Sequence, residues 1–255
     1  MEYKYFAELV NVIATLRSEN GCAWDREQTH SSLKRNMLEE AYEAVDAINN
    51  SDMKHLCEEL GDVLLQVVLH AQIAKENGDF DIEDVSKQIK DKLIHRHPHV
   101  FGDVKVKDTN EILENWEKLK SEEKPHRTSQ MDGISKAQSA LMSAQKISKK
   151  AVAVGFEWDS EESLRDCIKS EFKEFDDAKT IDEKEEEFGD ILFAVVNLAR
   201  WHKIDAEQAL LKANKKFITR FKMMETLAQK PLTEYDFVEF NELWVKAKQK
   251  IKEEL

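Results

Sequence analysis

The residues of this chain with the clearest chemical potential are pairs of acids spaced three apart. Glu40 and Glu43 form one pair, and Glu59 and Asp62 form another. This spacing places both acids of a pair on one face of a helix. Such carboxylates bind a divalent metal ion or form salt bridges, and four hard oxygen ligands suit Mg²⁺ or Mn²⁺ better than zinc or copper. On its own, the first pair would also fit an ordinary solvated helix face.

The stretch after the second pair is apolar around almost its whole circumference. Leucine and valine fill most positions from 60 to 69, and the polar side chains lie on one stripe made of Glu59, Asp62, Gln66 and His70. A helix with this pattern is usually buried. Because burying an ionised carboxylate without a partner is costly, the pattern predicts a neighbouring cation, which is a metal ion, a lysine or arginine side chain, or both.

The rest of the chain must supply the helices that hold these acids. It has 255 residues, 7 glycines and 3 prolines, and strand-like alternation is nearly absent apart from residues 104–107. These features predict an almost wholly α-helical fold. The apolar spacing predicts helices over 5–18, on each side of a turn at 49–52, from an N-cap at Asp81 to just before Pro98, and around 112–119.

Charge and cysteine content exclude several classes of partner and compartment. The formal net charge is −13, which argues against nucleic acid or an anionic membrane as the main partner. The three cysteines form no C-x-x-C pair, which predicts reduced thiols in a cytoplasmic protein. The N-terminus lacks a basic start followed by an apolar core, and no apolar run is long enough for a membrane span. We therefore expect neither a signal peptide nor a transmembrane helix.

The second half of the chain repeats the first. Residues 121–133 have no apolar periodicity and contain Pro125 and Gly133, which predicts a linker between an N-terminal domain over 1–120 and a C-terminal domain over 134–255. Offsets between matched residues drift from 124 to 134, as loop insertions and deletions would leave in a duplicated domain. The matched acids are Glu40 and Glu171, Glu43 and Glu174, Glu59 and Glu187, and Asp62 and Asp190.

The apolar helix is repeated together with its acids. Residues 188–198 are again rich in large apolar side chains, and a stripe of Glu187, Asp190 and Asn197 runs along them. Solvation does not explain an acid stripe on a buried helix that occurs twice. The repeat therefore favours metal binding by these carboxylates.

Two other kinds of site fit the sequence less well. A di-iron bundle expects a Glu-x-x-His step, which Glu27 and His30 supply in the first half, whereas the matching residues 161–164 lack histidine. The sequence also has no G-x-x-x-x-G-K-[ST] loop and few glycines to form a backbone cradle for phosphate. Phosphate groups would then be held by a metal ion and by side-chain cations.

Two pairs of residues four apart offer such cations. Lys216 and Arg220 form one pair and Trp244 and Lys248 the other, and both recur in the first half as Lys92 and Arg96, and Trp116 and Lys120. They fit a cationic wall for phosphates with an aromatic ring for a base or sugar. They also fit solvated basic residues and a tryptophan of the core.

Three motifs together resemble the MazG family of nucleoside triphosphate pyrophosphohydrolases. They are G-C-x-W-D-R-E-Q-T-H at 21–30, EE-x-x-E followed by E-x-x-D between 39 and 62, and H-P-H-V-F-G-D at 97–103. The resemblance covers essentially the whole chain. It implies an all-α, tandem-domain, Mg²⁺-dependent enzyme, usually a homodimer, that hydrolyses a nucleoside triphosphate to the monophosphate and pyrophosphate.

The resemblance also implies roles for individual residues. The metal ligands would be Glu171, Glu174, Glu187 and Asp190, which also carry the catalysis, with Glu40, Glu43, Glu59 and Asp62 in the first half. The nucleotide would contact Lys216, Arg220, Trp244 and Lys248, with Lys92, Arg96, Trp116 and Lys120 as counterparts. The second half departs from the pattern at Ser170, which replaces Glu39 and leaves that position without an acid for an outer-shell or base role.

The residues leave two rival interpretations open. In one, the chain is a non-catalytic nucleotide sensor or a helical scaffold dimer, and its acids pair with lysine and arginine. In the other, only one half is an active enzyme and the other half is structural. Each half keeps its own four acids, so the sequence does not choose between one active half and two.

Overall fold

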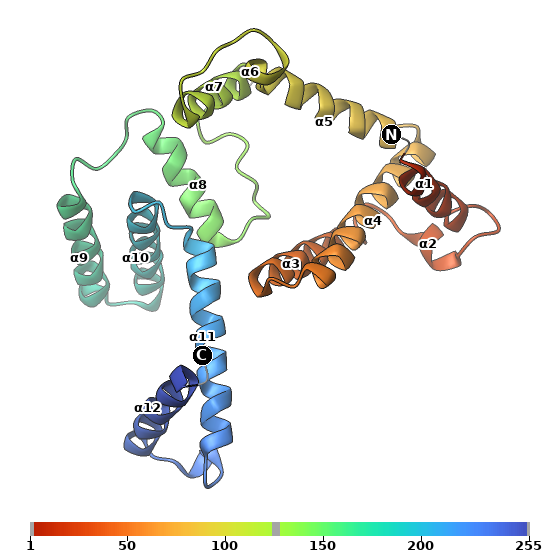
Figure 1. Cartoon of the computed structure of the whole chain (residues 1–255). Helices are drawn as coiled ribbons and strands as arrows, with labels where there is room; N and C mark the ends of the chain where they lie inside the picture. The colour runs from red at the N-terminus through yellow and green to blue at the C-terminus, as the bar shows by residue number, and fades with distance from the viewer. Residues whose placement is uncertain (1–2, 124–127, 254–255) are drawn as a thin grey trace. The chain divides into compact units, whose positions relative to one another are not determined.

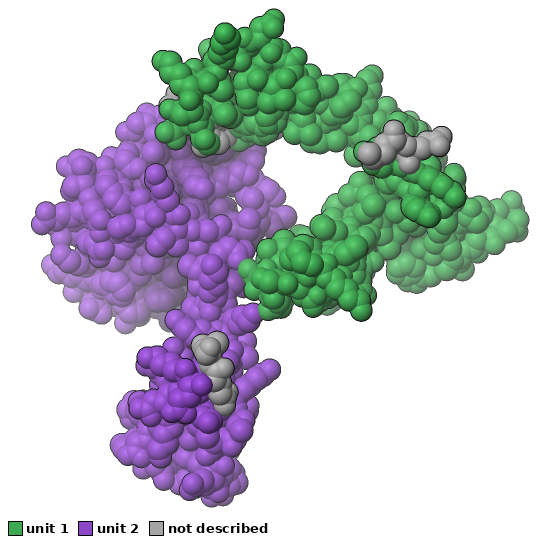
Figure 2. All heavy atoms as spheres, viewed as in Figure 1, with its two compact units in different colours: residues 1–125 green, residues 126–255 purple. Residues whose placement is uncertain are grey.

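The computed structural model describes residues 3–123 and 128–253, and every regular element in these ranges is a helix (Figure 1). The predicted all-α class is therefore confirmed, and residues 104–107 form no strand. The chain divides into two compact units, Met1–Pro125 and His126–Leu255 (Figure 2). Residues 124–127 of the predicted linker lie outside the described residues.

The first unit follows the helices expected from the sequence. The Asp81 side chain accepts hydrogen bonds from the backbone N–H groups of Glu83 and Asp84, so it is the predicted N-cap. The helices of this unit are α1 (Lys4–Leu16), α2 (Ala23–Glu27), α3 (Lys34–Asn50), α4 (Met53–Asn77), α5 (Ile82–Arg96), α6 (Pro98–Phe101) and α7 (Thr109–Glu122).

The second unit repeats the pattern of a helical hairpin followed by long helices. The Thr180 side chain caps the second helix of the hairpin in a reciprocal capping box with Glu183. The elements are α8 (Ala140–Val152), α9 (Glu161–Asp177), α10 (Ile181–Trp201), α11 (Ala206–Leu227), the short 3₁₀ helix η1 (Leu232–Glu234) and α12 (Phe237–Glu253).

The acid pairs lie on the two hairpins, α3–α4 and α9–α10, whose helices pack side by side (Figure 1). The turn between α3 and α4 is tight because Ser51 adopts a left-handed conformation and the Asp52 side chain caps α4. Each hairpin therefore fixes the acids of its first helix opposite the acids of its second.

Two buried arginines anchor the loops that carry the W-D motifs. The Arg17 guanidinium forms a bidentate salt bridge with Glu76 and donates to the backbone oxygen of Gln28 at 3.2 Å. In the second unit the Arg200 guanidinium forms a bidentate salt bridge with Glu157, at 2.6 Å for each hydrogen bond. Such paired contacts are strong and directional, so they hold each loop against its long apolar helix.

The long apolar helices are only partly buried, which differs from the expectation of burial on all sides. In α4, Val68 and Leu69 lie in the core of the first unit, but 53% of Leu60 is exposed. In α10, Ile191 is buried while 51% of Phe188 is exposed. The apolar pattern indicates that these faces pack against apolar side chains, and the described residues of each unit leave them partly exposed. No helix among the described residues is both long enough and apolar enough to span a bilayer.

Candidate active site

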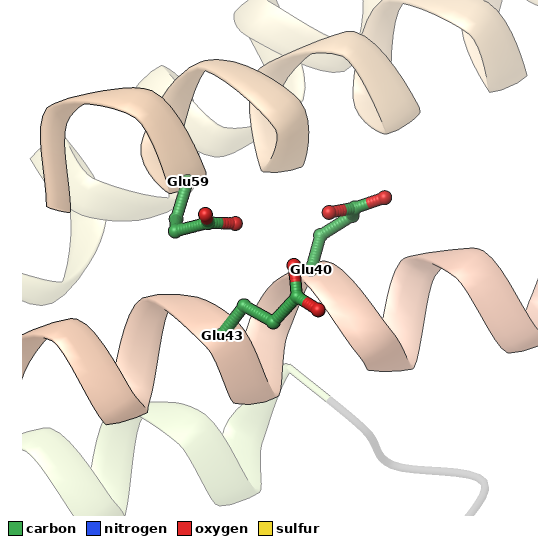
Figure 3. A group of neighbouring side chains, drawn as sticks. All are labelled: Glu40, Glu43 and Glu59. Carbon is green, nitrogen blue, oxygen red and sulfur yellow. The ribbon is translucent and has the colours of Figure 1, made fainter. Parts of the chain in front are cut away.

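The N-terminal acids form a cluster at the α3–α4 interface. Glu40 and Glu43 project from α3 toward Glu59 of α4, and one carboxylate oxygen from each lies within 4.8 Å of the others (Figure 3). Glu59 is buried, with 5% of its surface exposed. Asp62 lies outside this three-oxygen set, although its charge acts on both Glu40 and Glu59.

The C-terminal acids form a second cluster at the equivalent interface. Carboxylate oxygens of Glu171, Glu187 and Asp190 lie within 4.8 Å of one another. Glu174 lies outside this set, and its Oε1 accepts a hydrogen bond of 3.0 Å from Ser170. The serine at this position thus supports a neighbouring acid. Its counterpart Glu39 instead pairs with Arg35 on the exposed side of α3.

In both clusters the negatively charged carboxylates lie close enough to repel one another. Burial raises the pKa of Glu59, and the neighbouring Glu43 carboxylate raises it further. Burial likewise raises the pKa of Glu187, with additional repulsion from Glu174 and Asp190. A site that disfavours ionised carboxylates in this way is stabilised by a bound cation.

The first cluster offers a direct test of whether a metal ion fits. Glu59 Oε1 bonds to His55 Nε2 at 2.8 Å, while Glu59 Oε2 is buried with no hydrogen-bond partner. Among the described residues, no lysine or arginine forms a salt bridge with any of the eight predicted metal ligands. A buried, unpartnered oxygen on an acid that clusters with two further carboxylates fits a hard divalent cation, which takes oxygen ligands.

A pH-dependent stability follows from these raised pKa values. A carboxyl group whose pKa is raised on folding stabilises the protein below its unfolded pKa of about 4.5, and this contribution is lost as the pH rises through the folded pKa. Without divalent metal, Glu59→Gln should therefore have a higher Tm than the wild type at pH 8 and a smaller difference at pH 5. Thermal denaturation in EDTA measures this, and adding Mg²⁺ should stabilise the wild type more. A difference in Tm that is independent of pH and Mg²⁺ would contradict it.

In each unit one predicted cation, an arginine, lies against the predicted tryptophan. In the second unit the Arg220 guanidinium lies 5.6 Å from the Trp244 ring centroid, and the Phe217 ring lies 5.3 Å from it. In the first unit Arg96 lies 5.2 Å from the Trp116 ring, which His97 contacts edge-on. Each arginine therefore rests on an aromatic face that orients its guanidinium group.

The two arginines differ in their ionic partners. Arg96 forms a bidentate salt bridge with Glu123, with 2.9 Å between Arg96 Nε and Glu123 Oε1. This contact lowers the pKa of Glu123. No acid pairs with Arg220 within the described part of the chain. Within the described ranges, the second-half arginine is thus the one of the two that has no carboxylate partner.

The structure does not join the cations to the acids within either unit. In the second unit, α12 packs beside the C-terminal part of α11 and apart from the α9–α10 hairpin (Figure 1). In the first unit, the acids lie near the N-terminal end of α4. Helices α5 and α7 lie past the opposite, C-terminal end of α4 (Figure 1). Neither Lys216 nor Lys248 has a salt bridge to an acid of the described residues. Each half therefore presents two separate clusters.

Comparison with known proteins decides the family. The model of the MazG nucleotide pyrophosphohydrolase domain matches residues 28–101 and 159–224. The nucleoside triphosphate pyrophosphohydrolase/pyrophosphatase MazG of Thermotoga maritima is 47% identical, with 95% of both chains covered. The nucleoside triphosphate pyrophosphohydrolase of Escherichia coli K12 is 42% identical over 94% of this chain and 95% of its own. The chain belongs to the MazG family.

Membership in the MazG family confirms the resemblance, the tandem helical organisation and the enzyme class, a hydrolase of phosphoanhydride bonds. The two matched MazG segments contain all eight acids and the pairs that include Arg96 and Arg220. Both tryptophans of the cation clusters lie outside these segments, so Trp116 and Trp244 remain predictions from spacing.

Sequence reasoning missed two contributors to these clusters. Glu123 pairs with Arg96 from 27 residues away, and Phe217 covers Trp244 from the neighbouring helix. No periodic signal links either pair, because the contacts join separate helices across turns of variable length. The repeat could have revealed this difference, since the offset of 128 that relates Trp116 to Trp244 gives Ile251 at the position of Glu123.

Proposed function

We propose that the chain hydrolyses nucleoside triphosphates to the monophosphate and pyrophosphate with Mg²⁺ as its cofactor and Mn²⁺ as an alternative. The observation that carries this proposal is the three-carboxylate cluster that occurs in both halves, with a buried, unpartnered oxygen on Glu59. The relatives named nucleoside triphosphate pyrophosphohydrolase support the substrate class. The non-catalytic interpretation loses support, because it needs lysine or arginine partners for the acids.

The acids divide into ligands and a proton acceptor. Glu171, Glu187 and Asp190 would hold the metal ion, which supplies charge neutralisation for the triphosphate when bound. Glu174 lies outside this set, and Ser170 occupies only its Oε1. Its Oε2 is therefore available to take a proton from the water that attacks the α–β phosphoanhydride. Glu40, Glu43 and Glu59 would hold metal in the first half.

The cations would serve the leaving group. Breaking the α–β bond builds negative charge on the departing pyrophosphate, and positioned arginine and lysine side chains stabilise that charge. Arg220 is oriented by Trp244 and has no competing acid among the described residues, so it is the best placed of these cations. Lys216 and Lys248 would add further positive charge near the departing pyrophosphate.

We infer that the working enzyme is a homodimer in which the second copy completes each site. Large apolar side chains are exposed on both hairpins, including Leu60 and Leu64 of α4 and Phe188 and Leu192 of α10. Exposed apolar patches of this kind mark interaction surfaces. A second copy packed on a hairpin would cover them and would bring its own cations to the acids.

Mixing two inactive variants tests this shared site. One chain carries Glu59→Gln and Glu187→Gln, and the other carries Arg96→Ala and Arg220→Ala. Refolded together, half of the dimers are mixed, and one of the two equivalent sites in each mixed dimer is intact, so activity should return to about one quarter of the wild type. Light scattering should give the mass of a dimer. No recovery of activity in a population shown to contain mixed dimers would overturn the shared site.

Release of pyrophosphate tests the function itself. The chain is incubated with each nucleoside triphosphate and Mg²⁺, and the products are separated by ion-exchange chromatography. The proposal expects equal amounts of monophosphate and pyrophosphate, and none in EDTA. A protein that gains thermal stability with nucleotide and releases no pyrophosphate would instead be a nucleotide sensor.

A further inference from the structure

A cavity adjoins the C-terminal acid cluster. It has a volume of about 350 Å³ and lies wholly within the second unit. Two of the cluster acids, Glu171 and Asp190, form part of its wall, and the rings of Phe156, Trp158 and Phe193 also line it. Ligand sites are typically apolar and aromatic clefts of at least roughly 300 Å³ with a few fixed polar groups. This cavity therefore has the size and lining of a small-molecule subsite.

One of the polar groups that line this cavity is a buried and oriented amide. Asn197 is 8% exposed and Ser148 is 3% exposed, and both line the cavity. Ser148 Oγ donates to Asn197 Oδ1 at 2.5 Å, and Asn197 Nδ2 donates to the backbone oxygen of Phe193 at 3.1 Å. These two bonds fix which end of the amide is the donor. Each end of the amide can form one more hydrogen bond: Nδ2 has a second N–H to donate, and Oδ1 has a second lone pair to accept with.

The first half shows that packing does not require an amide at this position. The offset of 128 that relates Glu59 to Glu187 and Asp62 to Asp190 also relates Leu69 to Asn197 on the same helices. Leu69 is 3% exposed and lies in an apolar core with Ile13, Leu33, Val68 and Ile73. The hairpin thus tolerates a leucine here, and the buried polar pair is a property of the second half.

We propose that this cavity is the nucleobase pocket of the C-terminal site, with Asn197 as the residue that reads the base. A base is flat and aromatic, so it stacks on rings such as Trp158 and Phe193. Its hydrogen-bonding edge presents a donor beside an acceptor, which matches the two free capacities of the Asn197 amide. A base in the cavity directs its phosphates toward Glu171 and Asp190. Ser148 is a positioning residue, because it acts through Asn197.

This inference rests on the proposed hydrolase function and assigns a different task to each cluster. The cavity recognises the base, whereas Arg220 and Trp244 serve the phosphates. Trp244 suits that role, since its ring already contacts Phe217 and the Arg220 guanidinium. The C-terminal half then selects nucleotides over other polyphosphates.

In a Glu59→Gln background, which silences the first half, Asn197→Leu tests the pocket with substrates that differ only in the base. For nucleoside triphosphates we expect KM to rise about 10- to 100-fold, as for loss of a bidentate contact to a base. For ribose 5-triphosphate, which has no base, KM and kcat should stay within about twofold of the wild type. Ser148→Ala should give a smaller rise in KM with the same selectivity for substrates that carry a base.

A binding measurement separates this inference from the proposed function. Saturation-transfer NMR with the four ribonucleosides in EDTA needs neither metal nor turnover, and base protons should receive saturation from the wild type and lose it with Asn197→Leu. Gln145→Leu is the matched control. Gln145 lies on α8 and, like Asn197, has a buried side-chain amide, but it does not line the cavity. Its amide forms hydrogen bonds with the backbone of Ile204 and Ala206. This control should keep the nucleoside signal.

The possible results distinguish failure of the hydrolase proposal from failure of the base pocket. If the wild type releases no pyrophosphate yet nucleosides still bind through Asn197, the hydrolase proposal fails and the base pocket stands. If Asn197→Leu changes hydrolysis of ribose 5-triphosphate and of nucleoside triphosphates equally, or if Gln145→Leu gives the same loss, the pocket is overturned. Nucleoside binding that persists in Asn197→Leu would also overturn it.

Discussion

The chain carrying both Glu59→Gln and Glu187→Gln should lose roughly 10²- to 10³-fold in kcat for pyrophosphate release, the loss typical of removing one preorganised electrostatic group. Glutamine keeps the size of each side chain and removes its charge. Both glutamates belong to a three-carboxylate cluster, so the change removes one negative charge from the cluster in each half. A pyrophosphate assay at saturating Mg²⁺, with helical circular dichroism as the check on folding, measures the effect.

The single variants then apportion the activity between the halves. If both halves turn over, each single change should leave a substantial fraction of the wild-type rate. Glu58→Gln and Glu185→Gln are matched controls, because each lies one or two residues from a cluster acid on the same helix and is exposed. These controls should retain wild-type activity. Wild-type turnover in the double variant would remove the acid clusters from the mechanism.

Arg220→Ala should lower kcat by roughly 10²- to 10³-fold in the C-terminal site, as expected when a positioned cation no longer neutralises a departing phosphate. The guanidinium rests on Trp244 and has no acid partner among the described residues, so its charge is available to the substrate. Steady-state assays in a Glu59→Gln background, which silences the first half, isolate this effect. Arg220→Lys should recover only part of the rate, because ammonium cannot make bidentate contacts with phosphate.

The matched control is Arg165→Ala on α9. Arg165 forms an exposed salt bridge with Glu161 four residues earlier, a type of contact that contributes little to stability. It should leave kcat unchanged. Equal rates for Arg220→Ala and Arg165→Ala would show that the cluster around Trp244 is structural.

The acids were predictable from the sequence because short-range periodicity fixes their geometry. Spacing of three on each helix and a short turn between the helices brought Glu40 and Glu43 opposite Glu59, and the repeat did the same for Glu171 and Glu187. The N-cap at Asp81 was predictable for the same reason, since a cap acts within one turn.

Contacts between distant segments were not predictable in this way. The Arg96–Glu123 pair spans 27 residues and the Ser148–Asn197 pair spans 49, and nothing in the periodicity of either helix fixes its partner. Asn197 was visible only as a member of the polar stripe on α10. The exposure of Leu60 and Phe188 was also missed. An apolar pattern indicates that a helix face packs against apolar side chains, but it does not show whether these belong to the same chain or to another.

Anomalous diffraction from a crystal soaked with Mn²⁺ and a nonhydrolysable nucleoside triphosphate tests the metal assignment most directly. We expect a Mn²⁺ peak among the carboxylates of Glu171, Glu187 and Asp190, with oxygen ligands and at least one phosphate oxygen in its shell. A map that shows the bound nucleotide and no Mn²⁺ peak among these three acids would contradict it.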